Sequence, residues 1–479
     1  MKLLTKGYIT VFLSLSVTII LSLVLALYQG ARISAVRMKT ECVADIAMNS
    51  VLGEYSRALY EQYGLLMVDS SYGTGNHQIS NTKEHLMDYA RKNFERSTAG
   101  GILNAQTMTA MYCSDVNITG YSVATDGDYK VLERQILAYM ASEPVGSLLT
   151  DVTSNVACLE ENALDSTDVD AMASENQAIL DSVEPPVIIN DEGEEEVIAI
   201  GNPADTVNSQ RGIGVLSLAS PSYAEISKVV ITSGDYASER ENHRGTGLSD
   251  SEDVSASEKL LLEQYLHEKC GSYGKEKESS LLKYQLEYLI FGEKSDYKNL
   301  EKMAETMLFW REASNMMYLF SCGKKVEEAE LIATALSIIT FMPELAEPLK
   351  YSILFAWSFA ESISDINILL NGGRVPLMKS DSTWKLGIFD MFNFRSHLNN
   401  GDCGEGLYYQ DYVKMKLLMT PFDKKIEHLA DIIEMDIRQT AGNSGFRLDY
   451  CIDIIRAEFL IGTKYGYDTS IERTYGYER

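Results

Sequence analysis

The stretch KGYITVFLSLSVTIILSLVLALYQGARISAVR, residues 6–37 of the 479-residue chain, decides the architecture. Its central part, from Tyr8 to Tyr28, has 21 residues and no charged side chain. As a helix this run is about 31 Å long, which matches the hydrocarbon core of a bilayer. A secretory signal peptide has a shorter apolar region and a small-x-small cleavage site, whereas this run ends in ALYQGA. We therefore expect a retained transmembrane anchor over residues 1–30.

Small and hydroxyl-bearing residues recur at every fourth position of the anchor. The row consists of Thr10, Ser14, Thr18, Ser22, Ala26 and Gly30. Small residues let another helix approach closely in lipid, so the row is a candidate packing surface for a second copy or another single-span subunit. The row drifts by about 40° per step, so about three or four members can face one partner. The alternative is that serine and threonine are common in any single-span anchor, and both interpretations remain open.

The helical pattern continues beyond the anchor. Apolar residues fall near one stripe, and no proline occurs before Gly64. The stripe consists of Ile33, Val36, Val43, Ile46, Ala47, Val51 and Leu52. We therefore expect an amphipathic helix over residues 31–69 that continues directly from the anchor.

The body of the chain is acidic. The formal net charge is -27, although the first forty residues contain five basic side chains and no acid. Such a body repels nucleic acid, so we expect no nucleic-acid partner. Residues 141–210 carry 16 acidic side chains and no lysine or arginine, which favours a solvated acidic face. A cation-binding or partner-binding patch is the alternative, but Asp165, Asp168 and Asp170 lack the glycine that a calcium loop needs.

The residue types that usually carry catalysis or bind metals are dispersed. The seven cysteines (42, 113, 158, 270, 322, 403 and 451) include no C-x-x-C pair, so we expect mostly buried thiols and no zinc site. Pairing of Cys113 with Cys158, or of Cys403 with Cys451, remains open. The six histidines are isolated, and HExxH, GxSxG and P-loop motifs are absent from the sequence. We expect no catalytic residue, no metal and no cofactor.

Two short stretches come nearest to a chemical site. GDCGEG at residues 401–406 follows no clear strand and begins no P-loop, so it predicts a plain turn. Glu361 and Asp365 lie one helical turn apart on an apolar helix and have the spacing of a general acid and base. The favoured interpretation is structural, with Arg311 or Arg374 as the partner of the pair.

The rest of the chain predicts an α+β protein with a mixed α/β middle region and a mostly helical C-terminal half that ends in short strands. The middle region, 82–231, predicts helices over 82–96 and 129–140, a strand over 107–123 and a hairpin in PPVIINDEGEEEVIAI. The polar stretch 232–257 predicts a linker or mobile loop.

Region 258–479 predicts helices over 258–270, 280–291, 297–320, 326–341, 344–370, 408–419 and 424–439, then an aromatic strand over 459–475. LIATALSIITFM and YSILFAWSFA are each too short to cross a bilayer, so they predict a buried helical hairpin.

The N-terminus resembles TadE-like and TadG-like proteins of tight-adherence pilus systems. KGYITVF matches their basic residue, glycine and Ser/Thr-Val core, and RMKTECVADIAMNSVLGEY is similar to the TadG-type stretch after the membrane helix, with Ala44, Asp45 and Ala47 in matching places. The resemblance makes Gly7 a candidate processing point. Prepilin-like members carry glutamate at the fifth position after the cleaved glycine, where this chain has Phe12. We therefore expect the leader before Tyr8 to be kept.

Over its whole length the chain resembles an uncharacterised family of membrane-anchored proteins from Clostridia-type bacteria. The resemblance lies in ECVADIAMNSVLGEYSRALYEQYGLLMVDSSYG, YLIFGEKSDYKNLEKMAETMLFWREASNMMYLF, LFAWSFAESISDINILLNGGRVPLMKSDSTW, YYQDYVKMKLLM and SIERTYGYER. No established activity follows from it.

These observations favour a structural function. We expect a membrane-anchored, exported structural or accessory protein, not an enzyme, in a tight-adherence-type pilus or secretion apparatus. Its expected partners are membrane lipid and other single-span pilin-like subunits or itself. The alternatives are an acidic surface binding module and an envelope hydrolase. Basic residues flank the span on both sides, so charge alone does not orient it; the resemblance implies a single pass with a cytoplasmic N-terminus and an extracellular body.

Overall fold

A computed structural model describes residues 4–477 except 96–108, 142–147, 186, 190–194, 198–201, 203, 221–224, 249–255 and 399–400. The described chain forms two compact units. Unit 1 comprises Met1–Glu143, Asp235–Lys259 and Ile433–Arg479, and unit 2 comprises Pro144–Gly234 and Leu260–Ile432. Helices dominate and the strands are antiparallel, so the protein belongs to the α+β class that the sequence predicts. Each unit combines segments that are distant in the sequence, unlike the consecutive regions suggested above.

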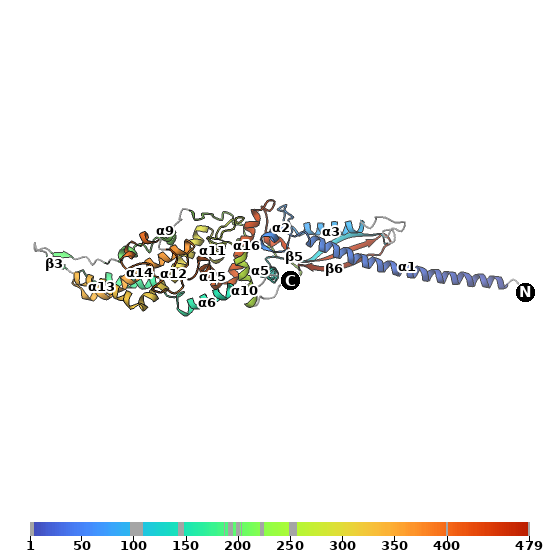
Figure 1. Cartoon of the computed structure of the whole chain (residues 1–479). Helices are drawn as coiled ribbons and strands as arrows, with labels where there is room; N and C mark the ends of the chain where they lie inside the picture. Colours follow the sequence, from blue (N-terminus) through green and yellow to red (C-terminus); the bar gives the residue numbers. More distant parts are fainter. Residues whose placement is uncertain are drawn as a thin grey trace. The chain divides into compact units, whose positions relative to one another are not determined.

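The N-terminal helix α1 (Leu4–Leu52) is one uninterrupted helix (Figure 1). Its residues from 7 to 31 lie at the surface, and burial of apolar side chains begins at Val36. The apolar helix thus runs directly into a packed one, as expected, but α1 ends at Leu52 and not near residue 69. A turn at Gly53 ends it, and Ser56 then caps the short helix α2 (Arg57–Tyr63) by accepting the Leu59 N–H.

Unit 1 is organised around an antiparallel sheet with β5 (Cys451–Thr463) at its centre. One edge of β5 pairs with β2 (Met111–Val123), and the other pairs with β1 (Val68–Asp69) and β6 (Thr469–Gly476). The predicted single strand over 459–475 is therefore wrong. Residues 464–468 reverse the chain, with Gly466 at a φ of 76°, and produce a β5–β6 hairpin.

Two helices cover the sheet of unit 1. Helix α1 packs on α3 (Ile79–Glu95) and on β6, and α3 packs on β2 (Figure 1). Side-chain burial alternates along the middle of β5, from Asp453 to Ile461, so that every second residue there reaches the core. The buried core includes Val43, Ala47 and Val51 of α1, Leu86 and Ala90 of α3, and Val116, Ile455, Ala457 and Phe459 of the sheet.

The predicted linker at 232–257 is an ordered part of unit 1 over residues 235–248. Thr246 exchanges two backbone hydrogen bonds with Tyr121 of β2, at 2.8 and 2.9 Å. Arg240 donates to the buried carboxylates of Glu434 and Asp449, at 2.8 and 2.6 Å. Charged hydrogen bonds to buried carboxylates hold a chain segment firmly, which explains why a stretch of polar composition is not a loose connection here.

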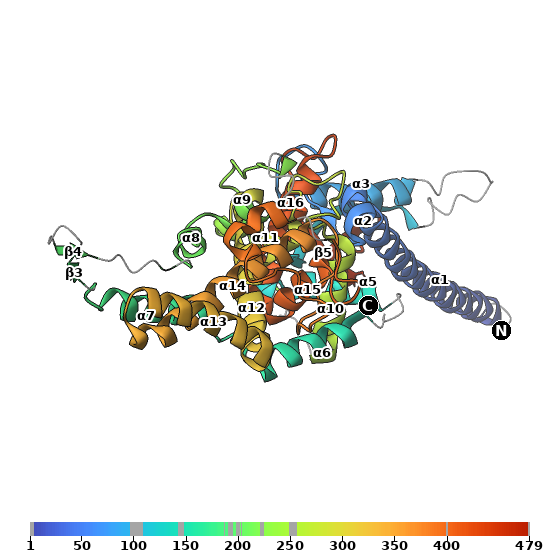
Figure 2. The same ribbon diagram turned by 60° about the vertical axis from the view of Figure 1, so that its left-hand side comes forward.

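Unit 2 is mainly helical, and three long helices follow one another in it. They are α12 (Asp296–Ser321), α13 (Gly323–Ile339) and α14 (Ala346–Leu370), and α14 packs against both others (Figure 2). The shorter α-helices of unit 2 are α6 (Leu148–Glu161), α7 (Val169–Asp181), α8 (Asp205–Asn208), α9 (Val215–Ala219), α11 (Gln285–Phe291) and α15 (Tyr409–Met419), and it has 3-10 helices at Pro343–Leu345 and Asp390–His397. Helices α10 (Ala256–Lys269) and α16 (Phe422–Arg438) contribute residues to both units. The predicted hairpin in the acidic stretch is present as β3 (Val187–Ile189) and β4 (Glu195–Val197).

Of the two segments expected to form a buried helical hairpin, LIATALSIITFM in α13 and YSILFAWSFA in α14, only the one in α14 is buried. All residues of α14 from Ser352 to Leu370 are buried, so this apolar helix is the core of unit 2. Helix α13 buries one narrow stripe and leaves Leu331 and Ile338 73% and 65% exposed. Among the described residues, two helices are long and apolar enough to cross a membrane, the exposed Gly7–Leu52 part of α1 and the buried Pro343–Leu370 segment. Only the first fits a membrane anchor.

Candidate functional site

The row of small residues lies on the bare half of α1. Thr10, Ser14, Thr18 and Ser22 donate their hydroxyl hydrogens to carbonyls one turn back on the same helix, at 2.8–3.0 Å. No neighbouring atom lies within 4 Å of an added Cβ at Gly7 or Gly30 in the described structure. A packing role for the row, and the retention of the leader that ends at Gly7, therefore stay predictions.

Replacing Ser14, Thr18 and Ser22 together by leucine tests the row. We expect association between membrane helices to weaken by roughly threefold or more, because branched side chains hold two helices apart where small ones let them touch. A two-hybrid assay in membranes measures this, with Ser16→Leu as the control on another face. Unchanged association in the triple variant would leave an anchor without a packing surface.

The carboxylates of Glu361 and Asp365 lie in a fully buried charge cluster of unit 2. Arg311 donates through Nε to Asp365 Oδ2 at 3.0 Å, and Lys379 Nζ lies 2.7 Å from Glu361 Oε1 and 2.6 Å from Asp365 Oδ1. All four side chains are 0% exposed. The structural interpretation with Arg311 is confirmed. Arg374 pairs instead with Asp402, and Lys379 is the partner that the sequence pattern does not reveal.

The cluster balances its charges internally. Burial alone lowers the pKa of Lys379, but Asp365 and Glu361 outweigh it and raise that pKa. Burial raises the pKa of Glu361, whereas for Asp365 the two cations outweigh burial and lower the pKa. Glu361 also accepts the backbone N–H groups of Lys385 and Leu386, at 2.9 and 2.8 Å. This arrangement fixes the loop after α14 on the helix core and gives a solute no access to either carboxylate.

Another buried carboxylate, that of Glu287 in α11, accepts hydrogen bonds from uncharged groups. Its Oε1 accepts the Tyr409 hydroxyl at 2.7 Å and the Tyr273 N–H at 3.0 Å, and Oε2 is buried without a hydrogen-bond partner in the described structure. Burial raises the pKa of Glu287 to about 7, against the effect of these two donors.

We expect Glu287→Gln to remove a pH dependence of stability. Between the unfolded pKa near 4.5 and the folded pKa of about 7, the folded chain holds a proton that the unfolded chain has released. The contribution of Glu287 to the free energy of unfolding of the wild type therefore falls as pH rises through this window, by roughly 3 kcal/mol, and does not change further above it. Urea unfolding at pH 5 and pH 8 measures the difference, which should shrink in the variant. The exposed Glu344→Gln is the control, and an equal difference in both variants would contradict the assignment.

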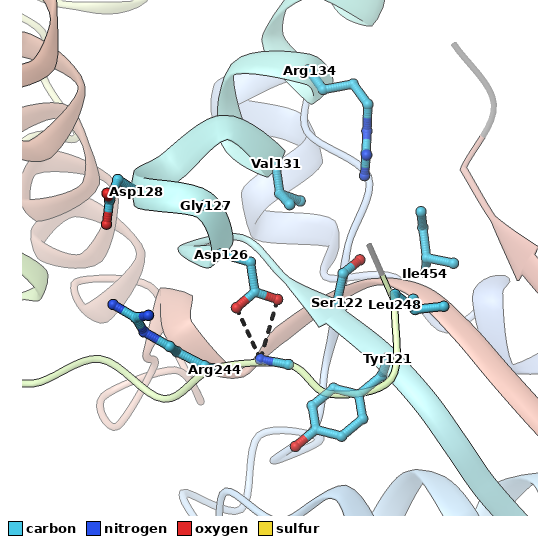
Figure 3. A pocket seen from close by; sticks show the side chains of 11 residues that line it. Tyr121, Ser122, Asp126, Gly127, Asp128, Val131, Arg134, Arg244, Leu248 and Ile454 are labelled. Carbon is cyan, nitrogen blue, oxygen red and sulfur yellow. Dashed lines mark hydrogen bonds between the residues drawn. The ribbon is translucent and has the colours of Figure 1, made fainter. Parts of the chain in front are cut away.

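A polar cavity lies in unit 1, beside the start of α5 (Asp126–Met140) (Figure 3). It has a volume of about 250 Å³. Asp126 accepts the Gly245 N–H there, at 2.9 Å to Oδ1. Gly127, Asp128 and Tyr129 all have positive φ values, of 63°, 56° and 72°. Such a run is costly for residues with a Cβ, and the two backbone contacts to Asp126, from Val123 and Gly245, hold it in place.

The cavity is lined by opposite charges. Figure 3 shows Asp128 and Arg244 at one side and Arg134 and Ser122 at the other. Arg134 donates to Asp453, and Ser122 Oγ is buried without a hydrogen-bond partner in the described structure. A cavity of this size and polarity suits water or a small polar molecule. The residues that line it include no histidine or cysteine.

The GDCGEG stretch is a turn, as predicted. Asp402 accepts the Arg374 backbone N–H at 2.7 Å and its Nη2 at 3.0 Å, and Gly401, Gly404 and Gly406 have positive φ values. In the acidic region, Asp168 caps α7 by accepting the Ala171 N–H, and Asp170 pairs with Arg211 at 2.9 Å. Within the described ranges, no group of three or more histidine, cysteine or acidic side chains is placed to hold a metal.

The cysteines are free thiols in the structure. Cys113, Cys270 and Cys451 are buried, Cys42 is exposed, and the others are half-buried. Neither of the two pairings left open by the sequence is formed. The expectation of mostly buried thiols therefore holds for three of the seven.

Comparison with protein-family models matches residues 192–463 to a family of unknown function, DUF5702. No curated protein and no solved structure matches the chain. The matched residues include the buried charge cluster, Glu287 and β5. They do not include α1.

Proposed function

The chain belongs to the family of unknown function DUF5702, and we propose from this premise that it is a membrane-anchored, exported structural or accessory protein of pilin-like construction. The observation that carries the proposal is the bare half of α1. Its apolar side chains are strongly exposed, with Phe12 at 65% and Leu27 at 67%. An exposed apolar helix of this length is costly in water and stable in lipid, where all its backbone groups are satisfied internally.

The second half of the same helix supports the pilin-like part of the proposal. A membrane helix that runs straight into an amphipathic helix has the shape of a pilin's first helix. In α1 the change occurs without a break, and Val36 is the first buried apolar residue after the uncharged run. The KGYITVF resemblance supports a tight-adherence-type pilus or secretion apparatus as the setting. The proposed partners are membrane lipid and other single-span subunits, or a second copy.

The proposed orientation places the N-terminus in the cytoplasm and the body outside the cell. We expect protease added to intact cells without their wall to digest the body from about Arg32 onward, because only the anchor and its short leader are then protected. Immunoblotting against a C-terminal tag measures the loss of the body.

Two controls make this test decisive. A cytoplasmic enzyme must remain intact during the digestion, and all chains must be digested after lysis. If the body survives in intact cells and is cut only after lysis, the orientation is inverted and the pilin-like proposal falls.

A further inference from the structure

The C-terminal hairpin of unit 1 is fastened along α1 at four successive levels. The Arg32 guanidinium lies 3.4 Å over the centre of the Tyr465 ring, and Arg37 Nε donates to the Tyr467 hydroxyl at 3.4 Å. Further along both elements, Arg473 pairs with Asp45 at 3.0 Å, and the Tyr477 hydroxyl donates to the Leu52 carbonyl at 2.5 Å. These contacts fix the position of the β5–β6 hairpin along the axis of α1. Strand β6 lies beside α1 in Figure 1.

The turn of this hairpin is itself well ordered. The Thr463 hydroxyl donates to the Tyr467 carbonyl at 2.8 Å and accepts the Tyr467 N–H at 3.0 Å. The Lys464 N–H donates to the Ala110 carbonyl at the start of β2, at 3.1 Å. The position of the turn is thus set by the sheet as well as by α1.

The turn of the hairpin lies against the part of α1 that directly follows the apolar run Tyr8 to Tyr28. Arg32 follows Tyr28, the last residue of that run, by four residues, which is a rise of about 6 Å on a helix. The headgroup layer on each side of the hydrocarbon core is about 5–8 Å thick. If Tyr28 lies at the edge of the hydrocarbon core, Arg32 and the Tyr465 ring beneath it lie within the headgroup layer.

The residues around the turn and the facing part of α1 differ in charge from the rest of the protein. Residues 28–40 and 460–467 contain four basic side chains and no acid, in a chain of net charge -27. The Tyr465 side chain is 57% exposed although it lies against Arg32, and Tyr28 is 48% exposed. Tyrosine, arginine and lysine are the residues that anchor proteins at membrane interfaces, because an apolar body ends in a polar or cationic tip.

We propose that Tyr28, Arg32, Lys464 and Tyr465 form a headgroup collar that contacts phospholipid headgroups and holds the sheet of unit 1 at the membrane surface. This rests on the proposed membrane anchor. The cations face lipid phosphate, the Tyr28 ring lies at the boundary between headgroups and acyl chains, and the Tyr465 ring lies within the headgroup layer. The collar then determines the height of the sheet above the bilayer, which a span joined by a flexible linker would leave undetermined.

The test uses the full chain in vesicles of three parts phosphatidylcholine to one part phosphatidylglycerol. Tyr465→Trp places a fluorescent reporter in the collar, and Lys464→Trp is a second reporter on the same turn. The native tryptophans Trp310, Trp357 and Trp384 all belong to unit 2, so the wild type supplies the background. Tyr60→Trp, at a position that is 46% exposed on α2, is the matched control. Quenchers are a phospholipid with a nitroxide on its headgroup and aqueous acrylamide.

We expect the headgroup nitroxide to reduce the added fluorescence of both collar reporters at least twofold and to leave the Tyr60→Trp reporter unchanged. Collar reporters quenched no more than the control, in chains that float with the vesicles, would overturn the collar and leave the anchor standing. Protection from both quenchers would also overturn it, because a second copy would then cover the turn. Chains that do not float with the vesicles overturn the anchor and the collar together.

Discussion

Lys379→Met is expected to lower the free energy of unfolding of unit 2 by about 3–5 kcal/mol, the usual loss when one partner of a buried ionic group is removed. Lys379 is the cation that contacts both Glu361 and Asp365, and its side chain is 0% exposed. Without it, Arg311 still pairs with Asp365, whereas Glu361 must take up a proton or stay unpaired. Methionine has a similar length and no charge, so the loss of stability comes more from the missing charge than from a change in side-chain volume. Urea unfolding followed by tryptophan fluorescence measures it, because all three tryptophans belong to unit 2.

Three comparisons separate this explanation from general damage. Lys302→Met removes a lysine that is 45% exposed and pairs with Glu293, and should cost less than about 1 kcal/mol. Adding Glu361→Gln to Lys379→Met should recover part of the loss, because the unpaired buried charge is then removed and the amide oxygen still accepts one of the two N–H groups, that of Lys385 or that of Leu386. The loss should also be smaller at pH 5 than at pH 8, where the unpaired carboxylate is harder to protonate. Equal losses in the two lysine variants would contradict the importance of the cluster.

A chain that begins at Ala31 is expected to keep unit 1 folded, whereas a chain that begins at Gly53 is expected to lose it. The residues before Ala31 bury no apolar side chain in the described structure. The residues removed only by the second truncation include seven buried apolar side chains, Val36, Val43, Ala44, Ala47, Met48, Val51 and Leu52. At about 1.5–3 kcal/mol for each larger side chain, their burial is on the order of 10 kcal/mol. This is comparable with the whole stability of a domain, about 5–15 kcal/mol.

Limited proteolysis with mass mapping distinguishes the two truncations. In the chain from Ala31, the sheet of unit 1 should resist protease as in the full chain, and the protein should leave the membrane fraction. In the chain from Gly53, β2, β5 and β6 should be cut early, while α14 of unit 2 stays protected. A protected sheet in the shorter chain would mean that α1 does not complete the core of unit 1.

The parts of the fold that depend on local chemistry could be predicted from the sequence. The uncharged run from Tyr8 to Tyr28 indicates a long apolar helix, and the apolar stripe beyond it indicates a packed continuation. Alternation predicts the strand over 107–123, and β2 is found at Met111–Val123. The end of α1 could not be predicted, because apolar residues continue past Gly53 and the chain resumes a helix at Arg57.

The buried charge cluster shows where such prediction stops. The four-residue spacing of Glu361 and Asp365 places both on one helix face, and a basic partner follows from the cost of burying charge. Arg311 is a candidate from sequence because it lies on a neighbouring predicted helix. Lys379 comes from an irregular segment after α14, whose path back over the helix depends on bonds such as Lys379 Nζ to the Thr383 carbonyl. Composition and periodicity carry no record of that path.

By itself the sequence determined the long apolar helix at the N-terminus, the acidic body and the α+β class. Only the tertiary structure decided that β2 pairs with β5, that α13 leaves its apolar face exposed, and that residues 235–248 belong to unit 1. The physical reason is the range of the interactions. Periodicity and hydrophobic length act between residues a few positions apart and can be read locally. A strand's pattern says which face is buried, but its backbone hydrogen bonds are satisfied by any strand, and the partner is selected only when the whole core packs.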